Sequence, residues 1–366
     1  ETIEVEGKDI SRLEGIEAFP NLKVLNCGNN SIQNLDLRQN PELEKLICNK
    51  NQLTQLDLSK NPKIYYLKCS ENQLEQLDVS HLEDLVTLDC AHNDLEQLDV
   101  RNSKSLVTLN CSWNRLTELD ADVSHKSHLE KVECQNNQLT SLILGQNKLL
   151  NKLNCAHNQL TQLNLNNMIS LKELRCQNNQ LTALDVSSSP DLTILVLKDN
   201  HLTSLNLDSN PHLDFSITDV YHSDFNNVYT VTLNPDRTFD LSTLPGNFDI
   251  KRVTGWEHGK ANGYILTVDE DTNVVYYGYR CITGMMETSF TLDVTGTGGG
   301  STGGGTVTPP EPPVTPPEPP VTPPSGGGGD GGAGIAVLAA AGAAVAGVVG
   351  YGVYNYVSGQ KLQALL

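Results

Sequence analysis

The sequence predicts an α/β-type solenoid of mostly β content, followed by a small antiparallel β-sandwich module, a proline- and glycine-rich linker and a C-terminal hydrophobic helix. Three observations predict this order. A cysteine recurs every 21 residues through the first half of the chain, with a single interval of 23. Short alternating apolar runs separated by turn residues come next. Proline and glycine then dominate up to a last stretch without charged residues.

The recurring unit defines the solenoid. Each copy follows the pattern LxxLxCxxNxLxxLDLSxNPx, and nine copies fill residues 22–212. This unit resembles the leucine-rich repeat, whose signature is LxxLxLxxNxL in a unit of about 20 to 29 residues. The resemblance implies one short strand per copy and a parallel β-sheet on the concave face. Residues 1–21 lack the repeat but keep apolar side chains, so we expect them to cover the open N-terminal end as a cap.

The cysteines occupy an inward position of the unit, because strand alternation places them on the side of the leucines. In-register thiols lie side by side rather than facing each other, which disfavours disulfides, and no CxxC pair offers the usual spacing of zinc ligands. The ninth copy has Leu197 in this slot, so we interpret the ladder as packing residues. A cysteine ladder of this kind is similar to that of internalin-like surface proteins of Gram-positive bacteria. Its members are Cys27, Cys48, Cys69, Cys90, Cys111, Cys134, Cys155 and Cys176.

Two polar ladders run beside the cysteines. We expect the first to consist of buried amides that satisfy backbone groups where each coil leaves its strand; it comprises Asn30, Asn51, Asn72, Asn93, Asn114, Asn137, Asn158, Asn179 and Asn200. The second lies between two inward leucines, so we expect it to face solvent rather than to bind a cation. It comprises Asp36, Asp57, Asp78, Asp99, Asp120 and Asp185.

After the repeats, residues 213–295 contain alternating apolar runs such as 229–233, 264–268, 274–279 and 289–294, separated by turn-rich segments. This spacing predicts the β-sandwich-like module, which would cap the solenoid. Cys281 has no partner outside the ladder, so we expect it to be reduced. The segment Leu244 to Phe248, LPGNF, resembles a sortase signal only superficially.

Residues 296–334 are rich in Gly and Thr and contain repeats of VTPPEPP, which predicts a linker with a semi-rigid polyproline II spacer. Residues 335–366 begin with an uncharged apolar stretch long enough to cross a bilayer. We predict a transmembrane helix there. A packing helix of a further domain and a disordered tail are the alternatives. The chain opens at Glu1 without Met, as a processed or truncated product would.

The outward positions of the strands are the candidate ligand-binding residues, because they line the concave face of this fold. The distinctive patch is central and consists of Tyr66, His92 and Trp113 with a polar border, a combination of aromatic and polar side chains that interface hot spots also have. The alternative is that a hydrophilic face tolerates one Trp by chance. The candidates are Tyr66, Lys68, Asp89, His92, Asn110, Trp113, Glu133, Asn154, His157 and Arg175.

The residues show no pairing of a nucleophile with a base, no opposed carboxylates and no metal-ligand cluster, so we expect no enzymatic activity, metal or cofactor. The net charge of −19 argues against nucleic-acid binding. The leading hypothesis is a bacterial cell-surface adhesion protein with a monomeric, extracellular N-terminal region, anchored by its C-terminal helix, that binds a protein or glycan. The alternatives are a structural envelope spacer and a recognition subunit of a larger protein truncated at Leu366.

Overall fold

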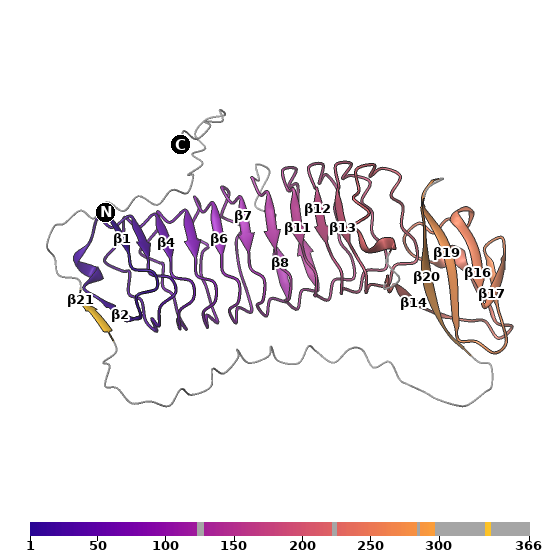
Figure 1. Ribbon diagram of the computed structural model, residues 1–366, viewed down its shortest axis with the longest axis horizontal. Coiled ribbons are helices and arrows are strands. Elements are labelled where there is room, and N and C mark those ends of the chain that lie inside the picture. Colours follow the sequence, from indigo (N-terminus) through magenta and orange to yellow (C-terminus); the bar gives the residue numbers. More distant parts are fainter. Residues whose placement is uncertain (123–127, 222–224, 284–285, 297–333, 338–366) are drawn as a thin grey trace.

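The computed structural model describes residues 1–122, 128–221, 225–283, 286–296 and 334–337. It is a long stack of flattened coils with a β-module against its C-terminal end (Figure 1). The predicted repeat solenoid is therefore confirmed. Short strands form one side of the stack, and irregular return segments form the other.

A ten-stranded parallel sheet runs the length of the solenoid, with one strand per coil and neighbouring strands in register. Each strand has three residues. In every strand but the first, the middle residue is buried and the outer two are mostly half-buried. In spatial order the strands are β1 (Thr2–Glu4), β3 (Val24–Asn26), β4 (Lys45–Ile47), β5 (Tyr66–Lys68), β6 (Thr87–Asp89), β7 (Thr108–Asn110), β9 (Lys131–Glu133), β11 (Lys152–Asn154), β12 (Glu173–Arg175) and β13 (Ile194–Val196).

The first strand, β1, comes from the N-terminal segment that lacks the repeat pattern. It pairs with β3 through partners such as Thr2 and Val24, so the cap continues the sheet by one strand. The backbone follows the repeat even beyond the strand, since Gly7 has φ 61 and its counterpart Asn29 has φ 52. A glycine suits this left-handed conformation because it has no Cβ.

Leucine and cysteine side chains fill the interior, as predicted. All nine cysteines are free and buried, including Cys281 in the β-module. Burial raises the pKa of the Cys111 and Cys155 thiols to about 12. These thiols stay protonated at neutral pH and act as small packing groups.

The asparagine ladder joins adjacent coils. In the second coil, Asn51 Nδ2 donates to the backbone oxygens of Cys27 at 3.0 Å and Cys48 at 3.1 Å. Its Oδ1 accepts from Ile32 N at 2.9 Å, so one buried amide satisfies three backbone groups from two coils. Equivalent bonds recur along the stack, for example at Asn158, which confirms the predicted role.

Residues 123–127, in the coil that is two residues longer than the others, lie outside the described residues. Two strands flank this point on the return side of the solenoid, β8 (Glu118–Asp120) and β10 (Ser141–Ile143), and they pair in parallel. The remaining helical turns are short 3-10 segments: η1 (Ile16–Ala18), η2 (Asp219–Tyr221), η3 (Leu241–Thr243) and η4 (Ile250–Arg252).

The β-module contains two sheets. One has four strands, in the order β14 (Val228–Thr232), β20 (Met286–Thr295), β19 (Val274–Ile282) and β16 (Val253–Glu257). The other has three antiparallel strands, in the order β15 (Thr238–Asp240), β18 (Ile265–Val268) and β17 (Gly259–Asn262). The expectation of a wholly antiparallel module is wrong at one pair. β14 runs parallel to β20, with Val228 opposite Thr291, and the residue just before β14, Asn227, forms a parallel bridge to Asn200 of the last coil.

The β-module and the last coil share one hydrophobic core. The segment resembling a sortase signal lies in this contact between the last coil and the β-module, which we call the seam. Leu244 and Phe248 are buried, and the backbone oxygens of Pro245 and Gly246 accept bonds from the hydroxyls of Thr203 and Ser204 at 2.8 and 2.7 Å. LPGNF is therefore a packing segment of the seam.

Most of the predicted linker and C-terminal helix lies outside the described residues. Residues 334–337 form β21 (Gly334–Val337), which pairs in parallel with β2 (Ile10–Glu14) beside the N-terminal cap (Figure 1). The start of the predicted helix at residues 335–337 is thus a strand, because β2 offers it an edge with which to pair. No helix within the described ranges is long and apolar enough to cross a bilayer.

Candidate binding surface

The sequence-predicted site residues lie on the strand side of the solenoid, in two kinds of position. Tyr66, Lys68, Asp89 and Asn110 occupy the outward positions of strands β5 to β7, where they are half-buried. The candidates Glu133, Asn154 and Arg175 have the same positions on β9, β11 and β12. His92, Trp113 and His157 instead follow their strands, two residues after the cysteine of each coil, and they are exposed.

This last position has a left-handed backbone in all nine repeats, which the sequence pattern did not reveal. Non-glycine residues are uncommon in this conformation, and Asn tolerates it best. The solenoid uses Asn at several of these sites, whereas His92 and Trp113 are bulky. The residues at this repeat position, all with φ between 52 and 57, are Asn29, Lys50, Glu71, His92, Trp113, Asn136, His157, Asn178 and Asp199.

His92 and Trp113 stack on each other across adjacent coils. Their ring centroids are 5.2 Å apart and their planes differ by 11°. Trp113 remains 43% exposed, so the pair forms a flat aromatic shelf where β6 and β7 end. The structure therefore brings together two of the three residues of the predicted central patch.

Tyr66, the third residue of that patch, has different neighbours. Lys45 Nζ lies 4.7 Å and Lys68 Nζ 5.6 Å from the centroid of its ring. Both distances are within the range of a cation–π interaction. Tyr66 begins strand β5, at the opposite end of the strands from the stacked pair.

An apolar row lies next to Tyr66, immediately before the strands, and it was not among the predicted candidates. Tyr65 is 40% exposed, and Val86 and Val107 are half-buried. The backbones of these three residues are hydrogen-bonded in sequence, from Val86 N to Tyr65 O and from Val107 N to Val86 O. Their repeat positions carry Lys23 and Glu44 in the first two coils, so a comparison of the copies could have found this row.

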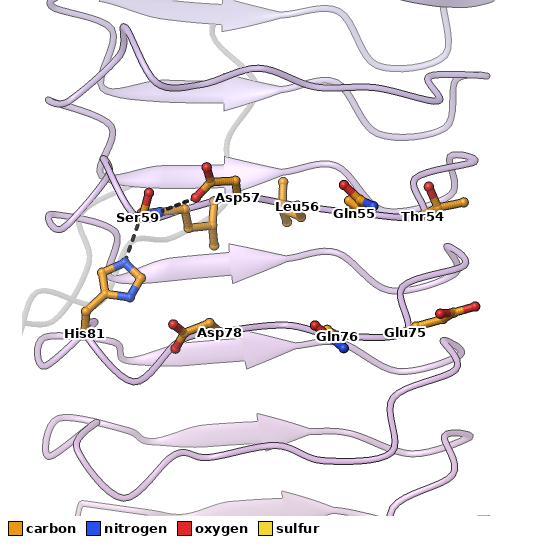
Figure 2. Close-up of a pocket in the computed structure, with 10 residues that line it drawn as sticks. Thr54, Gln55, Leu56, Asp57, Ser59, Glu75, Gln76, Asp78 and His81 are labelled. Atoms are coloured by element: carbon orange, nitrogen blue, oxygen red, sulfur yellow. Dashed lines mark hydrogen bonds between the residues drawn. The ribbon is translucent and has the colours of Figure 1, made fainter.

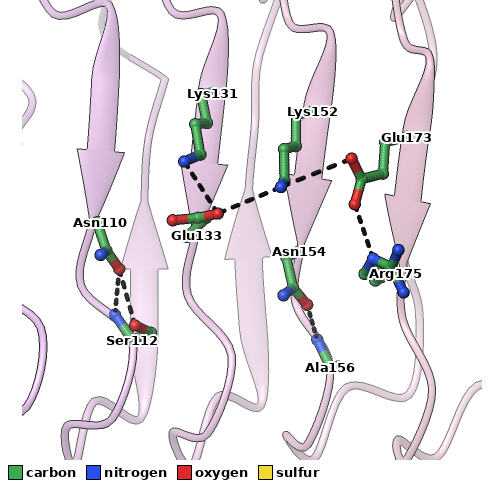
Figure 3. A network of polar contacts seen from close by, with 9 residues as sticks. All are labelled: Asn110, Ser112, Lys131, Glu133, Lys152, Asn154, Ala156, Glu173 and Arg175. Atoms are coloured by element: carbon green, nitrogen blue, oxygen red, sulfur yellow. Dashed lines mark hydrogen bonds and ion pairs between the residues drawn. The ribbon is translucent and has the colours of Figure 1, made fainter.

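The C-terminal half of the face carries a ladder of ion pairs (Figure 3). Lys131 and Lys152 contact Glu133 at 3.0 and 3.5 Å, and Lys152 also contacts Glu173 at 3.6 Å. Arg175 Nε donates to Glu173 at 2.7 Å. Partial burial acts to raise the pKa of Glu173, but the bond from Arg175 and the positive charges of Lys152 and Arg175 lower it overall. The charges in this part of the face therefore compensate one another.

Several predicted candidates also serve the backbone. The side-chain oxygens of Asp89, Asn110 and Asn154 accept bonds from the backbone N–H groups two residues later, at 3.4, 3.2 and 3.3 Å. Such local turns are what Asx side chains form readily. The amide of Asn110 also accepts from the hydroxyl of Ser112 at 2.8 Å. These three residues thus shape the strand ends in addition to lining the face.

The return side has a shallow hollow of about 450 Å³ between two coils (Figure 2). Two of its carboxylates, Asp57 and Asp78, are exposed, and they accept bonds from the backbone N–H groups of Ser59 and Ser80 at 2.9 Å. Bonds from these serines lower the pKa of both aspartates. The predicted solvent-facing aspartate ladder is confirmed, with a turn-capping role that the sequence pattern did not indicate.

His81 in the same hollow has a structural explanation. On the return side, a second ladder of buried amides binds backbone oxygens of the preceding coil. In this ladder, Asn61 Nδ2 donates to Leu37 O at 3.0 Å. The next copy has Leu82 at the position of Asn61, and His81 Nε2 lies 2.9 Å from the corresponding oxygen of Leu58. The imidazole thus binds a carbonyl that the missing amide would have bound. Within the described parts of the chain, no three His, Cys, Asp or Glu side chains are placed to hold a metal ion.

No protein-family model matches the sequence, and no curated protein matches it either. Among solved structures, the chain is similar to the functional domain of InlJ from Listeria monocytogenes, which includes a cysteine ladder (25% identity, 80% of this chain, 90% of that chain, TM-score 0.46). It is also similar to the leucine-rich repeat domain of APL1B (23% identity, 56% and 66%, TM-score 0.50) and to YopM from Yersinia enterocolitica (32% identity, 50% and 39%, TM-score 0.43). The matches span less than two thirds of the APL1B and YopM chains. The likeness to APL1B shows the leucine-rich repeat fold.

Proposed function

Because the chain folds as a leucine-rich repeat solenoid with a buried cysteine ladder, we propose that it is a non-enzymatic binding protein that recognises a protein partner through its concave face. Solenoids of this type present extended concave surfaces on which partners bind. The observation that carries the proposal is the stacked, exposed pair of His92 and Trp113.

The surroundings of the stacked pair support an interface. The two coils of the pair carry Val86 and Val107 before their strands, and the preceding coil carries Tyr65 in the same row. The coils on the C-terminal side carry the compensated ion-pair ladder instead. An aromatic and apolar centre beside a polar rim is the usual anatomy of a protein interface.

The fold itself gives no reason for an indole at residue 113. The left-handed backbone there disfavours any residue with a Cβ by about 1–2 kcal/mol relative to glycine, and Asn tolerates it best. Asn occupies the equivalent site in other coils, for example at residues 136 and 178. An exposed indole at a position that Asn fills in other coils points to a role in binding.

A screen of the intact chain against surface proteins, followed by affinity measurements, tests the proposal. We expect Trp113→Ala and His92→Ala each to weaken binding of a selected partner by roughly tenfold or more. Asn29→Ala is the matched control, because Asn29 is exposed at the same repeat position in the first coil and is not one of the candidate binding residues. Unchanged affinity in both variants for every partner found would contradict the proposal. Partners found only among glycans would change the ligand class.

We further propose that the protein acts in adhesion at a bacterial cell surface. The order of solenoid, β-module, Pro-rich linker and apolar segment is the order needed to present the concave face away from a membrane. Fractionation of cells expressing the chain with and without residues 331–366 tests this placement. The anchor is supported if only the longer form sediments with membranes, and it is wrong if both forms are equally soluble.

A further inference from the structure

We infer that Lys45, Tyr66 and Lys68 form a binding site for a carboxylate side chain of the protein partner. The inference rests on the proposed function, because it assigns a chemistry to one part of the same concave face. The site spans strands β4 and β5, in which Lys45 is the register partner of Tyr66.

The three side chains lie together on two adjacent strands. Tyr66 and Lys68 occupy the two outward positions of β5, and Lys45 lies beside them on the neighbouring strand. Both ammonium groups are close to the ring of Tyr66, at 4.7 and 5.6 Å from its centroid. All three residues are half-buried. The ring thus holds two positive charges near one point of the surface.

The charge environment separates these lysines from the other basic residues of the sheet. Lys131, Lys152 and Arg175 each pair with glutamates of the ladder in Figure 3. Neither Lys45 nor Lys68 forms an ion pair with any carboxylate of the described residues. These two charges are uncompensated in a chain whose net charge is −19.

The carboxylate nearest in register is already engaged. Asp89 is the strand partner of Lys68, but it accepts hydrogen bonds from Ser70 Oγ at 3.2 Å and Ala91 N at 3.4 Å. No ion pair joins Asp89 to Lys68 in the described part of the chain, so the ammonium of Lys68 is available to a partner.

The chemistry of the site fits a protein carboxylate. An ammonium on an aromatic face loses little further freedom when it binds an anion, and charge-assisted hydrogen bonds are stronger than neutral ones. The apolar row of Tyr65 and Val86 adjoins the site. The complementary ligand is therefore an Asp or Glu next to an apolar residue of the partner, which charge complementarity would also steer toward this point.

The test uses the intact chain and a phage-displayed library of random dodecapeptides as the probe. We expect the selected peptides to be enriched in Asp or Glu next to an apolar residue. Their affinity should fall roughly tenfold or more for the double variant Lys45→Gln/Lys68→Gln. Lys131→Gln is the matched control, because Lys131 lies on the same sheet but is paired with Glu133. Tyr66→Phe should bind as the parent does, whereas Tyr66→Leu should bind more weakly although both lysines remain.

Several outcomes would overturn the inference. They are selected peptides without acidic enrichment, peptides that bind the double variant as tightly as the parent, and a failure to select any peptide whose binding needs the two lysines. Binding to vesicles of anionic lipid that depends on these lysines, without acidic peptides, would assign the site to a membrane instead. Peptides that depend on Trp113 but not on the lysines would leave the proposed function intact and exclude this site. Circular dichroism of each variant checks that the fold is retained.

Discussion

The hydroxyl of Tyr277 in the β-module donates a 2.6 Å hydrogen bond to the backbone oxygen of Thr203 in the last coil of the solenoid. Both residues are buried, and Tyr277 also packs against Phe248 and Phe290. Beside this bond, Asp219 accepts from the backbone N–H groups of Leu197 and Lys198 at 2.8 to 3.0 Å. Its carboxylate thereby satisfies donors of the last coil that a further coil would otherwise bind. The seam ends the solenoid and joins it to the module.

Removal of the Tyr277 hydroxyl should destabilise the whole chain. Tyr277→Phe leaves the buried oxygen of Thr203 without its donor, which costs about 1–3 kcal/mol. Tyr276→Phe is the control, because Tyr276 is the adjacent residue and is 42% exposed. Guanidinium denaturation of both variants measures the difference in the free energy of unfolding. Equal stability of the two variants would show that the seam bond contributes nothing.

Substitutions in the buried asparagine ladder should destabilise the fold far more than substitutions of exposed asparagines. Asn93 Nδ2 donates to Cys69 O and Cys90 O at 3.1 Å, and its Oδ1 accepts from Leu74 N at 2.9 Å. Asn93→Ala leaves these buried groups without partners, so we expect a loss of about 3 kcal/mol or more. Asn34→Ala, at an exposed position, should change stability by no more than about 0.5 kcal/mol. Comparable losses in the two variants would contradict the bridging role.

The repeat made the scaffold predictable from sequence. Because all nine copies carry the same Leu and Asn and eight carry the Cys, the inward positions and the buried amides could be assigned without a structure. The left-handed conformation of His92 and Trp113 could not, because nothing in the motif prescribes φ at that position. The separation of Tyr66 from the stacked pair depends on where each strand begins and ends. The short strands β15, β16 and β17 were also missed, since they contain polar residues and glycine rather than an apolar run.

The aspartate ladder should make the protein sensitive to acid. Bonds from Ser59, Ser80 and Ser187 lower the pKa of Asp57, Asp78 and Asp185 below the usual value. A lowered pKa in the folded state gives stability that is present above the unfolded pKa, about 3.9. That stability is lost as the pH falls through the folded pKa.

Replacement of these three aspartates by asparagine tests the effect. Asn164 and Asn206 already accept the same turn bond at 3.0 Å in other copies, so Asn keeps the turn and removes the titration. We expect the triple variant Asp57→Asn/Asp78→Asn/Asp185→Asn to lose less stability between about pH 5 and pH 2 than the parent. Urea denaturation at each pH measures the slope. Parallel slopes would show that these carboxylates do not contribute to acid unfolding.

The cysteine ladder should make the protein sensitive to alkali. Burial holds the pKa of Cys69 and Cys90 well above the usual thiol value, and that of Cys111 is raised to about 12. A raised pKa gives stability that is complete below the unfolded pKa, about 8.5, and is lost as the pH rises toward the folded value. Each such thiol lowers the free energy of unfolding by about 1.4 kcal/mol for each pH unit above the unfolded pKa. The triple variant Cys69→Ala/Cys90→Ala/Cys111→Ala should therefore be less stable at pH 7, because of the cavities, yet lose less stability between about pH 8.5 and pH 11.

Thiol-reactive dye should label the native parent only slowly and label all nine cysteines after denaturation. Rapid labelling of the native chain, or equal alkaline slopes in parent and variant, would contradict a sealed thiol core.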